Sequence, residues 1–269
     1  MSAVPPIEEA TSSVATQEAT PGLLETFWAA VRFFTRVPVP GWVGHSQAQL
    51  DRAARWFPLV GALVGLVGGG VTLLAWAFTS PEVAVLLGMA ATVLITGAFH
   101  EDGLGDACDG FGGGWTPTQI LIIMKDSRIG SYGTVGVFFA LLIKWQSLVA
   151  VGWARVLPAL MAGHAVSRLT STVLIFALEY VREDLQSKAK PLARRMRVDD
   201  LVTAVVLGLL PCGLLPMRAA VTGVVTAGLV AVYLARRTVK RLGGYTGDVL
   251  GAVQQITEAA FYLALTASL

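Results

Sequence analysis

Long uninterrupted apolar runs constrain this chain more than any other feature of its sequence. Seven of them approach the ~20 residues that an α-helix needs to cross a bilayer. They cover residues 57–79, 83–99, 132–152, 157–178, 199–215, 219–235 and 250–268. Only 14% of the 269 residues are charged, whereas a soluble domain has roughly 25%. The sequence therefore predicts an all-α, polytopic bundle of about seven transmembrane spans.

The first part of the chain has a different composition. Residues 1–21 consist largely of Pro, Ser, Thr, Ala and Glu without an apolar core, which predicts a disordered tail rather than a signal peptide. Residues 22–37 are amphipathic and aromatic, a pattern typical of a helix that lies at the membrane interface. We expect residues 22–269 to form a single integral membrane domain.

The basic residues indicate an orientation. Two of the 20 Lys and Arg residues, Lys144 and Arg168, lie inside spans, and Arg155 and Arg218 lie on one side of a seven-span arrangement. Because basic connections face the cytoplasm, we expect the other, richer side to be cytoplasmic and the C-terminus to lie outside. A formal net charge of +2 gives no argument for a nucleic-acid partner. The sixteen residues on the richer side are Arg32, Arg36, Arg52, Arg55, Lys125, Arg128, Arg182, Lys188, Lys190, Arg194, Arg195, Arg197, Arg236, Arg237, Lys240 and Arg241.

An acidic stretch, HEDGLGDACDG, follows the second run at residues 100–110. If that run continues as a helix, Asp102, Asp106 and Asp109 share one face of it. Neighbouring carboxylates repel one another unless a cation neutralises them, and Mg²⁺ binds one or two carboxylates together with water and substrate phosphates. The stretch predicts a Mg²⁺ or Mn²⁺ site, with Glu101 as a weaker candidate ligand and His100 as a candidate general base. A solvated acidic loop is the alternative.

A basic motif, KDSRIGSYG, occupies residues 125–133 at the same side of the membrane. Lys125, Ser127 and Arg128 are candidates to bind substrate phosphate, because Lys and Arg suit phosphate oxygens. Asp126 is a candidate metal ligand or a carboxylate that orients Arg128. An ordinary basic pair at the membrane edge is the alternative interpretation.

Two further charged residues are candidates. Asp248 precedes the last run and could ligate metal, act as a general base or cap the helix. Arg168 lies within the fourth run, where a charge usually faces an interior or a cavity. It could hold a substrate phosphate or pair with Glu179 or Glu258.

Glycines accompany the acidic and basic motifs. Gly103 and Gly110 lie in the first, and Gly130 and Gly133 in the second. Glycine permits close backbone approach to a ligand and turns with positive φ, so we expect these four residues in loops around the site. The glycine-rich part of the acidic motif does not match a P-loop, because no GK[ST] sequence follows it.

Five motifs in order resemble the cobalamin synthase family, whose members are adenosylcobinamide-GDP ribazoletransferases. The family's acidic pattern falls without a gap on His100, Asp102, Gly103, Asp106, Asp109 and Gly110. The motifs are FFTRVPVP (33–40), FPLVGALVG (57–65), HEDGLGDACDGFGGG (100–114), MKDSRIGSYG (124–133) and GGYTGDVLGA (243–252).

The resemblance implies a reaction and its partners. A ribose hydroxyl of α-ribazole, or of its 5′-phosphate, attacks adenosylcobinamide-GDP, and GMP leaves. Mg²⁺ is the implied cofactor, the bacterial inner membrane the implied location, and Asp109 or Asp248 the candidate to accept the proton. A homo-oligomer and contacts with other late corrin-pathway enzymes are compatible with this interpretation.

Two other classes of protein compete with it. A divalent-cation transporter would place polar groups through the depth of the bilayer, whereas the acidic and basic motifs here gather at one face. A CDP-alcohol phosphotransferase that makes phospholipid has a related acidic signature. That signature is not met here, because Ala107 and Cys108 follow Asp106.

Overall fold

The computed structural model describes residues 21–44, 46–181 and 196–268. Within these residues the chain is helical, and the only extended pairing is an isolated bridge between Tyr180 and Tyr245. The predicted tail, except for residue 21, lies outside the described residues. The helices are α1 (Leu23–Phe34), α2 (Gln47–Ala53), η1 (Ala54–Trp56), α3 (Phe57–Trp76), α4 (Pro81–Thr96), α5 (Phe99–Gly113), α6 (Pro117–Ile123), α7 (Ser131–Val151), α8 (Trp153–Ala177), α9 (Val198–Leu209), η2 (Leu210–Leu214), α10 (Met217–Leu242) and α11 (Gly247–Thr266).

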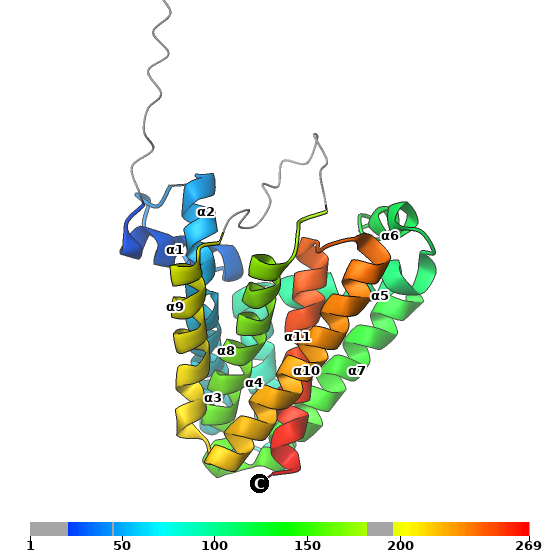
Figure 1. Cartoon of the computed structure of the whole chain (residues 1–269). Coiled ribbons are helices and arrows are strands. Elements are labelled where there is room, and N and C mark those ends of the chain that lie inside the picture. Colours follow the sequence, from blue (N-terminus) through cyan, green and yellow to red (C-terminus); the bar gives the residue numbers. More distant parts are fainter. Residues whose placement is uncertain (1–20, 45, 182–195, 269) are drawn as a thin grey trace, which may run out of the picture.

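The long helices stand side by side as a bundle (Figure 1). Helix α8 packs against α3 and α11, and α11 also packs against α5, α7 and α10. The short helices α1, α2 and α6 gather at the end opposite the C-terminus (Figure 1). This arrangement confirms the all-α bundle predicted from the sequence.

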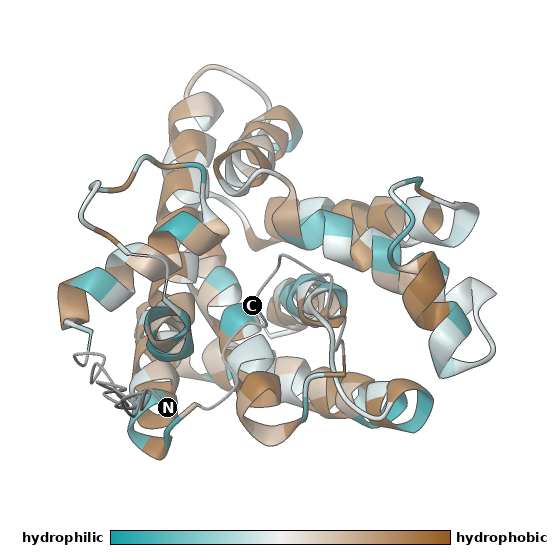
Figure 2. Ribbon diagram, turned by 90° about the horizontal axis from the view of Figure 1, so that it is seen from above, coloured by the Kyte–Doolittle hydropathy of each residue, from teal (hydrophilic) through white to brown (hydrophobic). Residues whose placement is uncertain are grey.

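Large apolar side chains face outward around the bundle. Leu74, Phe138 and Leu229 are each 60% exposed or more, and Figure 2 shows hydrophobic residues on helices all round the perimeter. A protein in water rarely exposes so much contiguous apolar surface, whereas a lipid environment favours it. The distribution fits the predicted membrane protein.

The number of spans stays a prediction. By length and composition, four helical stretches could cross a membrane (Gln47–Trp76, Ser131–Val151, Trp153–Ala177 and Met217–Leu242), and α4 with α5 would make a fifth if that bent pair were one span. The predicted spans at 199–215 and 250–268 correspond to α9 with η2 and to α11. The first contains Pro211, which cannot donate a helical hydrogen bond, and the second carries several polar side chains.

The second predicted span does not continue straight through the acidic stretch. Helix α4 ends at Thr96, and α5 starts at Phe99 with its axis bent by 88° from that of α4. Gly97 and Ala98 make the bend in the left-handed region, at φ of 69° and 59°. The sequence offers Gly97 as a helix end but gives no signal that the neighbouring alanine adopts the same conformation. Helix α5 therefore lies across the end of the bundle.

The predicted interfacial helix is confirmed as a separate helix, α1. It buries Ala29, Ala30 and Phe34 against the bundle and exposes Leu23 and Leu24. Two prolines shortly after its end, Pro38 and Pro40, prevent it from continuing. It lies across the same end of the bundle as α5 (Figure 1).

The basic residues also sort by end of the bundle within the described part of the chain. Helices α1 and α2, the α6–α7 connection, the start of α9 and the end of α10 carry the described members of the basic group, and all lie at the end opposite the C-terminus (Figure 1). Arg155 and Arg218 begin α8 and α10 at the other end. These described basic residues therefore lie at the two ends of the bundle in the two groups that the sequence predicted.

Candidate active site

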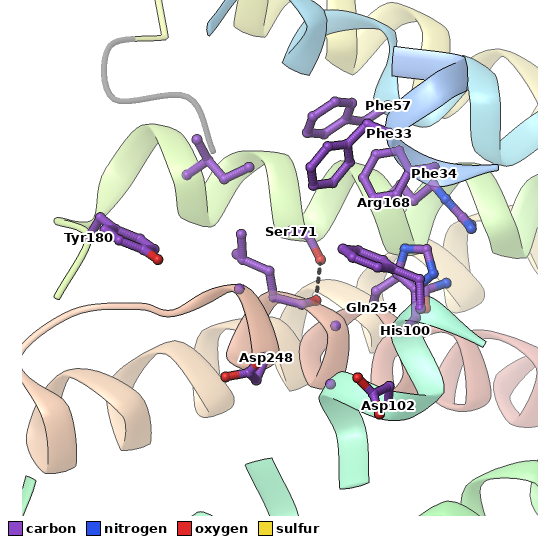
Figure 3. A pocket seen from close by; sticks show the side chains of 16 residues that line it. Phe33, Phe34, Phe57, His100, Asp102, Arg168, Ser171, Tyr180, Asp248 and Gln254 are labelled. Atoms are coloured by element: carbon purple, nitrogen blue, oxygen red, sulfur yellow. Dashed lines mark hydrogen bonds between the residues drawn. The ribbon is translucent and has the colours of Figure 1, made fainter. Parts of the chain in front are cut away.

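A cavity of about 280 Å³ opens at the end of the bundle where α5 lies. It is lined by residues of α1, α3, α5, α8 and α11, including Asp102, Arg168 and Asp248. Figure 3 shows Asp102 and Asp248 near each other on one side, with Ser171 and Gln254 between them and a group of phenylalanine rings. The Ser171 hydroxyl donates to the Leu250 carbonyl at 2.9 Å, which ties α8 to the first turns of α11.

Two glycines let α5 and α11 approach until their backbones touch. A Cβ atom on Gly103 would lie 3.1 Å from the Asp248 carbonyl oxygen and 3.3 Å from the Cα of Gly251. This contact places Asp102, the neighbour of Gly103, and Asp248 at the same cavity. Two segments nearly 150 residues apart in the sequence thus supply one carboxylate each.

Three of the four glycines predicted to lie in loops lie inside helices. Gly103 and Gly110 are inside α5 and Gly133 is inside α7, so the prediction was wrong for these three, whereas Gly130 lies in the α6–α7 connection as the N-cap residue of α7. None of the four has positive φ. Their common property is close packing, since a Cβ atom on any of them would crowd a neighbouring residue.

Asp109 joins the acidic motif to the basic one. Its Oδ2 accepts a hydrogen bond from the Gly130 amide at 2.6 Å, and its Oδ1 accepts one from the Gly133 amide at 2.8 Å. A carboxylate at the N-terminus of a helix satisfies amides that have no partner within the helix and interacts favourably with the helix dipole. Asp109 therefore caps α7, a contact that the spacing of the acidic motif did not indicate.

The three aspartates of α5 do not converge on one point. They keep the helical spacing predicted from the sequence, but Asp102 lines the cavity while Asp109 binds the start of α7. Asp106 is half-buried between them. Among the described residues, no group of three or more His, Cys, Asp and Glu side chains is arranged to hold a metal ion.

Mg²⁺ does not require such a group. It is commonly held by one or two carboxylates and completes its shell with water and substrate phosphate oxygens. Asp102 and Asp248 supply two carboxylates at one cavity, so the donor set fits this ion. The metal roles of Asp106, Asp109, Glu101 and Asp126 stay predictions.

The basic motif forms an exposed connection between α6 and α7. The Arg128 guanidinium binds both carboxylate oxygens of Asp126, at 3.0 Å and 2.7 Å. These hydrogen bonds lower the pKa of Asp126 to about 2. Of the two roles considered for Asp126, the geometry favours orientation of Arg128. Lys125 and Ser127 are exposed.

The three motifs meet at one end of the bundle, as the sequence predicted. Asp109 connects α5 to the start of α7, and Gly103 connects α5 to α11. The Thr246 hydroxyl, which caps α11, also lies 4.0 Å from the Met124 sulfur at the end of α6.

Arg168 lines the cavity and is 2% exposed. Its guanidinium donates to the His164 carbonyl at 3.1 Å and lies 5.7 Å from the centre of the Phe34 ring. Its Nε has no hydrogen-bond partner among the described residues. A buried cation with a free donor at a cavity is suited to bind an anionic group of a ligand.

A buried polar network stands behind Arg168. Glu258 lies 3.0 Å from the Lys144 Nζ and 3.3 Å from the His164 Nδ1. The Arg168 Nη1 lies 3.1 Å from the same His164 Nδ1, so His164 connects Arg168 to Glu258. Of the two acids considered for Arg168, Glu258 is therefore the one in its network, whereas Glu179 is exposed.

Glu101 and His100 occupy different environments on α5. The Glu101 Oε1 accepts from the Gln255 amide at 3.0 Å, which connects α5 to the same network, and its Oε2 is buried without a partner in the described chain. His100 lines the cavity and stacks on Phe34, with ring centres 5.2 Å apart. Both candidates thus face inward rather than toward the exposed basic connection.

Sequence reasoning missed the network and the aromatic wall of the cavity. Lys144, His164 and Glu258 lie on three different helices, so no local spacing connects them. The available signal was their presence inside apolar runs, because a charge at such a position is usually functional or paired. Phe33, Phe34 and Phe57 gave no signal of their own, since aromatic residues are ordinary in membrane helices.

Comparison with known proteins agrees with the predicted resemblance. A relative from Shewanella frigidimarina (strain NCIMB 400), named adenosylcobinamide-GDP ribazoletransferase, is 46% identical over 247 residues, or 91% of this chain and 95% of the relative. A relative of the same name from Ralstonia pickettii (strain 12J) is 48% identical over 239 residues, or 87% and 92%. A third, from Shewanella halifaxensis (strain HAW-EB4), is 44% identical over 248 residues, or 90% and 95%.

A family model agrees with these relatives. No solved structure matches the chain. The family described as cobalamin-5-phosphate synthase matches residues 26–266, which is nearly everything after the predicted tail. The chain belongs to the cobalamin-5-phosphate synthase family.

Proposed function

We propose that this chain joins adenosylcobinamide-GDP to α-ribazole, or to α-ribazole 5′-phosphate, and releases GMP. The observation that carries the proposal is the near full-length match to relatives named adenosylcobinamide-GDP ribazoletransferase. In the reaction, a ribose hydroxyl oxygen forms a bond to the phosphorus nearer the cobinamide. The bond from that phosphorus to the GMP oxygen breaks, and GMP leaves with the electron pair.

The cavity supplies groups that suit this chemistry. Phosphoryl transfer depends mostly on positioning and on stabilising negative charge. Arg168, with its free Nε at the cavity, would bind a phosphate oxygen of the diphosphate. Asp248 would accept the proton of the attacking hydroxyl, because its carboxylate lies at the cavity on the helix facing Asp102.

Asp102 would also hold Mg²⁺, with Asp248 as a second ligand through the carboxylate oxygen that does not accept the proton. The ion would supply positive charge to the diphosphate. Asp102 is exposed at the cavity, so it can reach a ligand without rearrangement of the bundle. His100, Lys125, Ser127 and Arg128 remain candidates for contacts with the substrates, and Asp109 is a weaker candidate base because both its oxygens already accept hydrogen bonds.

The rival classes are not favoured. The relatives carry the name of a transferase rather than of a transporter or a phospholipid enzyme. The charged groups in the bundle interior are also tied to one another, as Lys144 is to Glu258, instead of lining an open path.

The direct test is GMP release by purified protein incubated with adenosylcobinamide-GDP, α-ribazole and Mg²⁺. We expect GMP from the wild-type chain and none from Asp102→Asn. Asp199→Asn is a matched control, because this aspartate lies at the start of α9 and pairs with Arg197 away from the cavity. A folded wild-type chain that releases no GMP would refute the proposed reaction, and full activity of Asp102→Asn would refute the role of Asp102.

We also propose that the protein lies in the bacterial inner membrane with the cavity facing the cytoplasm and the C-terminus outside. The support is the basic end of the bundle, because basic connections stay on the cytoplasmic side. In a background without Cys108 and Cys212, an impermeant maleimide added to intact cells tests this. We expect Ser268→Cys to react and Ser127→Cys to be protected, and the opposite pattern would refute the orientation.

A further inference from the structure

One wall of the cavity consists of phenylalanine rings from three different elements. Phe33 and Phe34 come from α1, Phe57 begins α3, and Phe99 begins α5. Two of the five motifs behind the family resemblance, FFTRVPVP and FPLVGALVG, contribute three of these rings. Neither motif had a chemical role in the sequence argument, and the structure places the rings of both at the candidate active site.

The four rings form one connected cluster, in which Phe33 and Phe34 each contact the other rings. The centres of Phe33 and Phe99 lie 5.3 Å apart, and those of Phe34 and Phe57 lie 4.5 Å apart, both pairs being edge to face. Phe33 also lies nearly parallel to Phe57, with an angle of 15° between their planes. Such pairs hold one another in position, so the wall is a fixed aromatic surface rather than a set of mobile side chains.

The carboxylates of the cavity lie on the side opposite these rings, whereas Arg168 lies beside Phe34 (Figure 3). Figure 3 shows Phe33, Phe34 and Phe57 together on one side and Asp102 with Asp248 on the other. The aromatic and acidic sides are joined through α5, because Phe99 and Asp102 both line the cavity. Phe99 and Asp102 are three residues apart on this helix, a rise of about 4.5 Å, which a ribose can span. A nucleotide has the same two parts, a flat apolar base and a charged phosphate.

The size of the cavity limits what it can hold. Its volume of about 280 Å³ is just below the ~300–1,000 Å³ that is usual for sites of drug-sized ligands. A corrinoid is much larger than such a ligand, so the cavity can take only one end of adenosylcobinamide-GDP. At one end of the wall the Phe99 side chain is 43% exposed, so its ring is accessible to a ligand.

We propose that the wall formed by Phe33, Phe34, Phe57 and Phe99 binds the planar aromatic base of one substrate. Aromatic side chains bind bases by stacking, because every base has a π-face. The base is either the guanine of adenosylcobinamide-GDP or the benzimidazole of α-ribazole, and the ribose attached to it then points toward Asp102. This inference rests on the proposed function for the identity of the two substrates. It extends that function by assigning residues that bind a substrate but take no part in proton transfer or phosphate binding.

The test measures binding without turnover. Phe33→Leu and Phe99→Leu keep an apolar side chain but remove the flat ring, and neither phenylalanine is fully buried. Calorimetric titrations of the purified protein in detergent use GMP in one arm and α-ribazole in the other. We expect both variants to bind one of these two probes roughly tenfold more weakly and the other with unchanged affinity. The arm that changes identifies the base.

Phe138→Leu is the matched control, because Phe138 is 60% exposed on α7 and does not line the cavity. It should leave both affinities unchanged. Thermal unfolding of each variant separates loss of binding from loss of fold. If Phe33→Leu and Phe99→Leu are folded and bind both probes like the wild type, the proposal is overturned, and a lipid acyl chain becomes the occupant to test.

Failure of this inference can be told from failure of the proposed function. A wild-type chain that releases GMP, together with variants whose affinities do not change, refutes only the base-binding wall. A folded wild-type chain that releases no GMP in the activity assay refutes the function whatever the titrations show. A wild-type chain that releases GMP and variants that each lose one affinity support both.

Discussion

Loss of the contact between Lys144 and Glu258 should destabilise the bundle strongly. This contact joins α7 to α11, and the two side chains are 5% and 2% exposed. Breaking a buried ion pair by removing one partner costs about 3–5 kcal/mol, because the other charge stays buried and uncompensated. In Glu258→Gln, Lys144 keeps one acceptor, the Gln255 Oε1 at 2.6 Å. We therefore expect the lower end of the range, a loss of about 3 kcal/mol.

The reverse substitution should cost a similar amount. In Lys144→Met, the Glu258 carboxylate keeps the Gln254 amide at 2.5 Å and the His164 Nδ1 at 3.3 Å as donors. We expect a loss of about 3 kcal/mol here too. The double variant Lys144→Met with Glu258→Gln removes both charges of this pair, so that Arg168 alone of the three groups keeps a buried charge. Since replacing a buried ion pair by neutral groups is often nearly neutral, the double variant should be more stable than Glu258→Gln alone, in which Lys144 and Arg168 both stay buried and charged.

The assay is reversible unfolding in mixed micelles, with increasing SDS and tryptophan fluorescence as the signal. Gln146→Met is the control, because Gln146 is an exposed residue on the same helix and its loss should change stability by less than about 0.5 kcal/mol. Single variants that each cost under about 1 kcal/mol would contradict the argument. So would a double variant whose loss equals the sum of the two single losses, because independent sites add.

Three further predictions follow from other contacts. Gly103→Val should separate α5 from α11, lower stability by about 1–3 kcal/mol and reduce GMP release, whereas Gly70→Val, with open space at its Cβ, should not reduce release. Ala98→Gly should raise stability by up to about 1 kcal/mol in thermal unfolding, because it removes the left-handed strain at φ 59°. Asp126 has a folded pKa of about 2, below its ordinary 3.8, so its pair with Arg128 should stabilise the connection fully above pH 3.8 and lose that contribution as pH falls through 2. Carboxyl NMR of labelled aspartate checks this, and Arg128→Gln should move the titration upward.

Most of the bundle was predictable because its helices coincide with long apolar runs in the sequence. The run at 132–152 corresponds to α7 (Ser131–Val151), and the run at 250–268 to α11 (Gly247–Thr266). The run at 219–235 was too short, because α10 continues to Leu242 through a basic stretch. Polar residues extend a helix beyond the membrane without changing its backbone, and a hydropathy pattern cannot detect that extension.

The contacts of the candidate site were less predictable than its residues. The motifs named Asp102 and Asp248 as candidates, and the structure places both at one cavity. The prediction that three motifs meet at one end of the bundle agrees with the contacts among α5, α7 and α11. They did not show that the Asp109 carboxylate caps α7, because its partners are backbone amides about 20 residues further along the chain. The spacing of side chains along one helix shows which residues share a face. Which other helix packs against that face depends on the tertiary fold, so the spacing does not predict it.

The bend between α4 and α5 brings the acidic residues of α5 to the candidate active site, directly after an apolar helix that ends at Thr96. A straight continuation of α4 from Thr96 would carry Asp109 about 20 Å beyond the end of the span, into water and away from α7 and α11. The 88° bend instead lays α5 across the bundle. Asp102 then faces the start of α11 and Asp109 the start of α7, while Glu101 on the inner side reaches Gln255. Left-handed backbone at Gly97 and Ala98 is therefore the local cost of a helix whose acidic residues remain beside α7 and α11.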